Sequence, residues 1–199
     1  MQPDPIKKFA AVFAKLPGVG PRQAVRLAFH LVESEQSLLG EISDSVAELM
    51  GLKICRNCFF VHGNSDGLCD ICRDPKRNPQ IIAVVEKATD LLSLEKTKKF
   101  SGRYLVLGDL KKTGVMEPEQ KLRMAALKKY IEKDCGGQAE EIILAINPTA
   151  YGDLNAAMLT TELKPFAKKF SRLGRGIPTG GEIEFADEET LSSALERRT

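Results

Sequence analysis

The sequence predicts an α/β protein: an N-terminal helical region, a small four-cysteine segment and a mostly parallel sheet covered by helices. Three observations lead to this fold class. Apolar residues follow helical spacing through residues 5–52, and four cysteines gather within residues 55–72. Beyond residue 79, short apolar runs alternate with helical patterns. Strands that alternate with helices are typical of a parallel sheet with helices on both of its faces.

The first region, residues 1–54, is predicted to contain three helices. Residues 5–15 place Phe9, Val12 and Phe13 on one helical face, and Pro17 ends that pattern. Pro21 suits the first turn of a second helix, and a third is predicted across residues 37–52.

The connection between the first two helices, Leu-Pro-Gly-Val-Gly-Pro, is a candidate DNA-binding hairpin. Gly18 and Gly20 tolerate a tight turn and leave backbone N–H groups at a helix N-terminus, which attracts phosphate. Arg22 and Arg26 lie one turn apart and can share a helix face. An ordinary helix hairpin with a solvated arginine face explains the same spacing, and any DNA binding of this kind is sequence-independent.

The second region, residues 55–78, is predicted to be a metal-binding finger. Cys55 and Cys58 form one Cys-x2-Cys pair, and Cys69 and Cys72 form another. Two such pairs can place four sulfurs around one Zn2+, which leaves no site for substrate and makes the metal structural. Two disulfides are the alternative; the N-terminus shows no secretory signal, so metal is favoured.

Residues 79–176 form the predicted α/β region. Strands are expected at residues 80–86, 103–108 and 141–146, and helices at 89–97, 119–134 and 154–170. The basic stretch Lys164–Arg175 would then lie on a solvated helix face, and Asp74–Pro79 would be a linker. The last region, residues 177–199, reads as a glycine-rich turn, a strand at 182–185 and a helix that Asp187 caps.

Three acidic residues follow the predicted strands: Glu86, Asp109 and Asp153. The carboxyl edge of a parallel sheet is where ligands bind, and carboxylates brought together there could hold Mg2+. Such a site supports phosphodiester chemistry. The alternative makes Glu86 and Asp109 surface acids and Asp153 a helix cap.

These motifs, in this order, resemble the bacterial recombination mediator family RecR along nearly the whole chain. The resemblance lies in residues 16–31, the four cysteines, residues 81–86 and 143–149, and residues 172–191. It implies that the α/β region is a Toprim domain, the fold of topoisomerases and DnaG-type primases. Catalytic Toprim domains carry an Asp-x-Asp pair where this chain has Asn147 and Thr149, so the resemblance implies no enzymatic activity and at most weak Mg2+ binding.

The chain departs from the family pattern in two places. Tyr151-Gly152-Asp153 stands where the family has a Glu-Gly-Glu-like segment, and Leu107–Lys112 replaces a glycine-rich stretch. Both departures put the family's metal site in doubt.

The resemblance also implies a function: a clamp on single- and double-stranded DNA that helps load recombinase onto SSB-coated strands. Its implied partners are RecO- or RecF-type proteins and further copies of itself, from dimer to tetramer ring, in the cytoplasm at the nucleoid. Residue by residue, Arg22 and Arg26 match the family's basic hairpin positions. A metal-dependent phosphodiester enzyme and a protein-only assembly adaptor remain the alternatives. The formal net charge of +2 does not distinguish among these three functions. The fifth cysteine, Cys135, is expected to be a free thiol.

Overall fold

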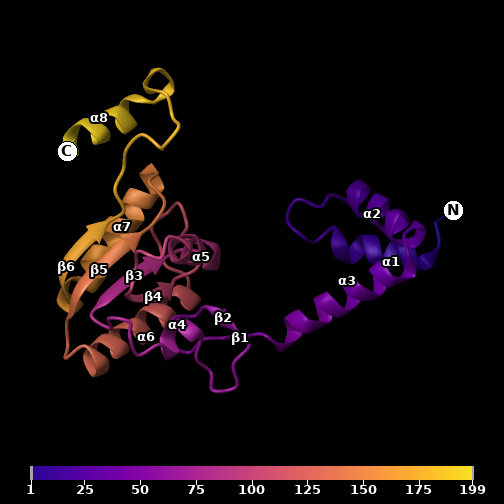
Figure 1. Cartoon of the computed structure of the whole chain (residues 1–199), viewed down its shortest axis with the longest axis horizontal. Coiled ribbons are helices and arrows are strands. Elements are labelled where there is room, and N and C mark those ends of the chain that lie inside the picture. Colours follow the sequence, from indigo (N-terminus) through magenta and orange to yellow (C-terminus); the bar gives the residue numbers. More distant parts are fainter. Residues whose placement is uncertain (1, 199) are drawn as a thin grey trace. The chain divides into compact units, whose positions relative to one another are not determined.

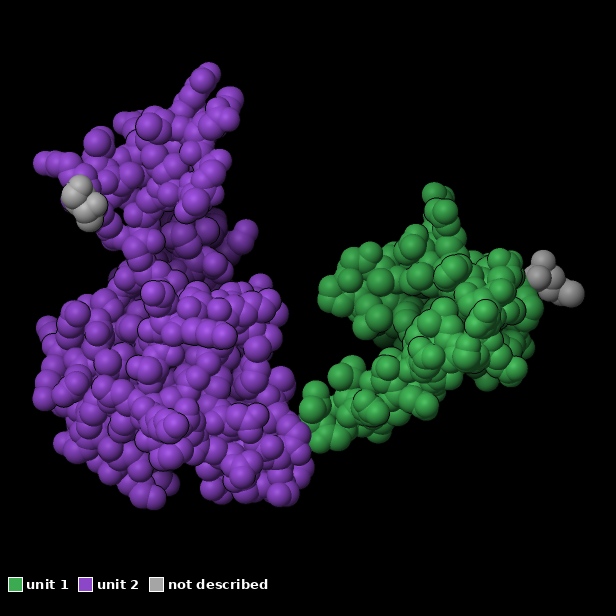
Figure 2. Space-filling model, viewed as in Figure 1, with its two compact units in different colours: residues 1–52 green, residues 53–199 purple. Residues whose placement is uncertain are grey.

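The computed structural model describes residues 2–198 and divides the chain into two compact units. Unit 1 comprises residues 1–52 and unit 2 residues 53–199 (Figure 2). The finer division into four regions stays a prediction. No helix among the described residues is both long and apolar enough to cross a membrane.

Unit 1 is helical, as predicted. Its helices are α1 (Asp4–Phe13), α2 (Pro21–Glu33) and α3 (Gln36–Glu48), and a short 3-10 turn follows at Leu49–Gly51 (Figure 1). Helices α1 and α2 pack against each other through a small core of Ile6, Ala24 and Ala28. Phe9 and Phe13 stack with their ring centroids 3.9 Å apart.

Unit 2 is built on a four-stranded sheet in the order β4-β3-β5-β6. All neighbouring strands in it are parallel, which confirms the predicted fold class. The strands are β3 (Ile81–Val85), β4 (Arg103–Val106), β5 (Ala139–Ala145) and β6 (Ala167–Arg172). The helices around it are α5 (Ala88–Lys96), α6 (Pro118–Asp134) and α7 (Ala150–Leu163).

The two faces of the sheet carry separate cores because successive side chains of a strand point to opposite faces. Ile82 and Val84 pack in one core with α6 and α7, whereas Ala83 and Val85 pack in the other with α5 and the cysteine segment. The cysteine segment comprises the hairpin β1 (Lys53–Ile54) and β2 (Val61–His62) and the single turn α4 (Asp70–Arg73). It therefore takes the place of a helix on the second face.

The predicted linker is attached to the sheet rather than free. Arg77 forms an ion pair with Glu95 at 2.5 Å, and the hydroxyl of Tyr104 donates to Glu95 at 2.7 Å. The Asn78 N–H donates to the carbonyl of Ser101 at 2.8 Å. These contacts hold the segment against β4 and α5.

The helix predicted over 154–170 is wrong in its second half. Helix α7 ends at Leu163, a 3-10 turn spans Lys164–Phe166, and residues 167–172 form β6 instead. Pro165 has no backbone N–H and cannot continue a helix, and the strand at residues 167–172 pairs with β5. The basic stretch therefore lies largely on an edge strand, not on a helix face.

The strand predicted at 182–185 is also wrong, because Ile183–Phe185 is a 3-10 turn. A strand needs a neighbour for its hydrogen bonds, and none of the described strands pairs with this segment. The cap prediction is confirmed: the carboxylate of Asp187 accepts the Thr190 N–H at 2.9 Å and begins α8 (Glu188–Glu196).

Candidate nucleic-acid interface and metal centre

The hairpin between α1 and α2 folds as its glycines require. Gly18 has a φ of 80°, a left-handed conformation that favours glycine. The Val19 N–H donates to the Leu16 carbonyl at 3.1 Å and closes the turn. Gly20 is the N-cap of α2, and its carbonyl accepts the Ala24 N–H at 2.9 Å.

The N-terminus of α2 presents donors without partners. Pro21 has no N–H, and the N–H groups of Arg22 and Gln23 have no hydrogen-bond partner within residues 2–198. Arg22 and Arg26 are exposed, and neither forms an ion pair with a described carboxylate. Backbone donors, the positive end of a helix and two free guanidinium groups are together suited to DNA phosphates.

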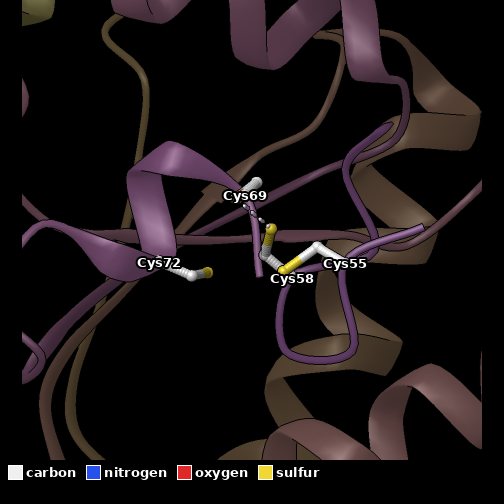
Figure 3. A group of neighbouring side chains, drawn as sticks. All are labelled: Cys55, Cys58, Cys69 and Cys72. Atoms are coloured by element: carbon white, nitrogen blue, oxygen red, sulfur yellow. Dashed lines mark hydrogen bonds between the residues drawn. The ribbon is translucent and has the colours of Figure 1, made fainter. Parts of the chain in front are cut away.

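The four cysteines form a single cluster, shown in Figure 3. Their sulfur atoms all lie within 4.8 Å of one another, and the sulfurs of Cys58 and Cys69 are 3.4 Å apart. Four sulfurs at about 2.3 Å from one Zn2+ are about 3.8 Å apart in a tetrahedron, so this cluster fits the ion. Cys55, Cys58 and Cys69 are buried and Cys72 is half-buried.

Hydrogen bonds join the cysteine segment to the sheet. The Cys58 carbonyl accepts the Val106 N–H at 2.8 Å, so the segment covers the outer edge of β4. Phe59, next in the chain, has a φ of 63°, and the Arg123 guanidinium lies 5.1 Å from its ring centroid. Arg123 also donates to the Val106 carbonyl at 2.8 Å. A metal held by the cluster would therefore brace β4 at the edge of the sheet.

The three predicted acids do not form a second metal cluster. Within the described residues, the four cysteines are the one group of three or more ligands close enough to share an ion. Glu86 directly follows β3, and Asp109 lies exposed, 3.5 Å from the Lys87 ammonium. Asp153 lies in the first turn of α7 rather than at its cap, which is Thr149.

Asp153 is held by two arginines that the sequence reasoning did not connect to it. Arg172, at the end of β6, and Arg175 both donate to one oxygen of its carboxylate. The hydrogen bond from Arg172, followed by that from Arg175, lowers the pKa of Asp153 below its ordinary value. Arg175 also pairs with Glu189 of α8 at 2.9 Å, which links the C-terminal segment to α7. The sequence placed Arg172 on a predicted helix face, and the ion pairs with Asp153 depend on its position at the end of β6.

The turn that carries Asn147 and Thr149 is tightly packed. The Thr149 hydroxyl accepts the Gly152 N–H at 3.0 Å. A Cβ at Gly152 would lie 1.9 Å from the Asn147 carbonyl oxygen, so this position requires glycine. Asn147 and Thr149 are neutral and exposed, and they leave Glu86 without a carboxylate pair at the next strand end.

Cys135 lies apart from the cluster. Its thiol is buried and within 3.4 Å of the Pro79 carbonyl oxygen, and burial raises its pKa. A buried thiol of raised pKa is unreactive, which suits a packing role.

Comparison with known proteins matches three regions of the chain to family models. Residues 6–50 match the RecR helix-hairpin-helix, residues 80–174 a Toprim domain and residues 176–199 the RecR C-terminal region. Proteins named "Recombination protein RecR" are similar along the full length. The protein from Myxococcus xanthus is 39% identical over 100% of this chain and 98% of its own.

Two further relatives of the same name agree with this match. The protein from Anaeromyxobacter sp. is 39% identical over 98% of this chain and 96% of its own. That from Synechococcus elongatus is 39% identical over 98% of this chain and 95% of its own. The chain therefore belongs to the RecR family of recombination repair proteins, with a helix-hairpin-helix region and a Toprim domain.

Proposed function

We propose that this chain is a non-enzymatic, DNA-binding mediator of recombinational repair. The observation that carries the proposal is the N-terminus of α2, where unpartnered N–H groups and the exposed Arg22 and Arg26 lie together. These groups suit the phosphate backbone and offer no base readout, so binding is sequence-independent and covers single and double strands.

The proposed mediator acts as a clamp made of several copies. Unit 1 has three buried apolar residues, Ile6, Ala24 and Ala28, yet it exposes many large ones. The exposed set includes Val12, Leu16, Val32, Val46, Leu49 and Met50. So many exposed large apolar side chains on so small a unit favour a protein interface, and a second copy of unit 1 is the partner that we propose. A ring of copies would concentrate the hairpin charges although the net charge is only +2.

The cysteine cluster supports a structural Zn2+ in this proposal, one per chain. All four ligand positions would be filled by sulfur, so the metal would hold the segment against β4 and supply no reaction. Glu86 is left as a weak Mg2+ ligand at most, because Asn147 and Thr149 supply no charge and two arginines hold Asp153.

The cellular part of the proposal follows the family. The clamp would act with RecO- or RecF-type proteins, in the cytoplasm at the nucleoid, to load recombinase onto SSB-coated strands.

The salt dependence of DNA binding tests the role of the hairpin. Arg22→Ala with Arg26→Ala should weaken binding and make the slope of log K against log salt shallower by about 0.9 per lost duplex phosphate contact. Lys7→Ala is the matched control, because Lys7 is paired with Asp4 at 3.0 Å and lies on α1. An unchanged slope in the double variant would remove the hairpin from the DNA site.

A further inference from the structure

The loop after β4 and the first turn of α7, where we expect the chain to depart from the RecR pattern, lie together at the carboxyl edge of the sheet. Lys112, from the loop after β4, lies with its ammonium nitrogen 5.2 Å from the centroid of the Tyr151 ring in the first turn of α7. A cation at this distance is attracted to the ring face. The two segments therefore form one local site.

Tyr151 is an accessible aromatic ring on a rigid support. Half of the residue is exposed, whereas Tyr104 is buried and Tyr130 half-buried. Its neighbour Gly152 is fixed against the Asn147 carbonyl and by the Thr149 hydroxyl, so the start of α7 cannot shift freely. The backbone that carries the ring is thus fixed, while the surface of the ring stays open.

Lys112 keeps its charge available. Two neighbouring lysines are neutralised by carboxylates: Lys87 lies 3.5 Å from Asp109, and Lys111 lies 2.7 Å from Glu117. Among the described residues, Lys112 has no carboxylate partner.

The helix beside the ring adds backbone donors. The Thr149 hydroxyl accepts a hydrogen bond from the Gly152 N–H at 3.0 Å, and the Thr149 carbonyl accepts one from the Asp153 N–H at 2.8 Å. Within residues 2–198, the N–H groups of Ala150 and Tyr151 have no partner. An anion beside Tyr151 would meet these donors and the positive end of α7.

We propose that this edge is a second nucleic-acid site that binds single-stranded DNA, with a base stacked on Tyr151 and phosphates at Lys112 and the start of α7. An exposed aromatic ring beside a free cation is the combination by which proteins bind single strands without sequence preference. In a duplex both faces of each base are covered by neighbouring bases, so the site prefers single strands. The proposal rests on the DNA-binding function proposed above and adds the single-strand preference to it.

A tryptophan at position 151 reports base stacking directly, because the chain contains no natural tryptophan. The full-length Tyr151→Trp protein is titrated with oligo(dT) at low salt. Saturable quenching of its fluorescence is expected. Glu132→Trp, in the last turn of α6 and so at the opposite edge of the sheet, is the matched control and should not be quenched. Absence of quenching in Tyr151→Trp, with the oligonucleotide bound, would overturn the proposal.

The affinities of variants for single-stranded and duplex DNA distinguish this site from the hairpin. Tyr151→Ala should weaken binding of single strands by about 5-fold or more and leave duplex binding unchanged, whereas Tyr151→Phe keeps the ring and the affinity. Lys112→Gln should make the single-strand salt slope shallower by about 0.7. If wild-type protein binds single strands and Tyr151→Ala binds them equally well, this proposal fails and the hairpin function stands. If wild-type protein binds no DNA at low salt, both fail.

Discussion

Gly152→Ala tests whether the turn at the start of α7 is as tightly packed as the structure indicates. The new Cβ would lie 1.9 Å from the Asn147 carbonyl oxygen, a backbone atom that cannot rotate away. Observed Cβ atoms stay beyond 3.0 Å, so the turn must move by an ångström or more. That movement breaks the hydrogen bond from the Gly152 N–H to the Thr149 hydroxyl.

Two contributions set the size of the effect. Loss of an N-cap hydrogen bond costs about 1 kcal/mol. Overpacking a buried position costs about 1–3 kcal/mol more. We therefore expect the free energy of unfolding to fall by about 2–4 kcal/mol, which corresponds to a Tm lower by about 5–15 °C for a chain of this size.

Thermal unfolding followed by circular dichroism measures this effect. Gly63→Ala is the matched control in the same unit, because nothing lies within 4 Å of its new Cβ. Its Tm should stay the same or rise slightly. If Gly152→Ala unfolds at the wild-type temperature, the tight packing of this turn is refuted, and with it the rigid support proposed for Tyr151.

Three further predictions concern other parts of the chain. The purified protein should contain one Zn2+ per chain by elemental analysis, and Cys72→Ser or chelation should lower the Tm of unit 2; a chelated protein of unchanged Tm would contradict the bracing role. Burial would raise the pKa of Glu95, but hydrogen bonds from Arg77 and Tyr104 outweigh it and lower that pKa below its ordinary 4.5. The stabilisation from this carboxylate is therefore complete above about pH 4.5 and disappears as pH falls through the lowered pKa. Glu95→Gln should be less stable than wild type at pH 7, and its free energy of unfolding should fall less on acidification. Equal falls in wild type and variant would contradict the pairing. Asp187→Ala should speed hydrogen exchange at the start of α8, because the cap contributes about 1 kcal/mol, whereas unchanged exchange at Thr190 would show that the cap is dispensable.

Local patterns predicted their structures well because the determining contacts lie close in sequence. The two Cys-x2-Cys pairs bring their sulfurs together within one short segment, and Asp187 caps α8 through a residue three positions away. The strand β3, residues 104–106 of β4 and residues 142–145 of β5 are apolar runs, which is the pattern of strands covered on both faces.

Contacts between distant residues explain the errors. Residues 167–172 carry a pattern compatible with a helix, and only their pairing with β5 makes them a strand. Residues 182–185 look like a strand but find no neighbouring strand among the described residues. The ion pairs of Asp153 and the contact of Lys112 with Tyr151 likewise join separate elements, so no local pattern could reveal them.

We propose that this protein binds DNA through the hairpin of unit 1 and leaves the DNA intact, and one gel experiment tests both parts. Labelled single- and double-stranded DNA, incubated with the protein and Mg2+ and resolved on a gel, reports complexes and cleavage products together. We expect shifted, full-length DNA whose complexes weaken as salt rises and are lost first in Arg22→Ala with Arg26→Ala. Shortened DNA that disappears with Glu86→Ala would contradict it and make the carboxyl edge of the sheet an active site.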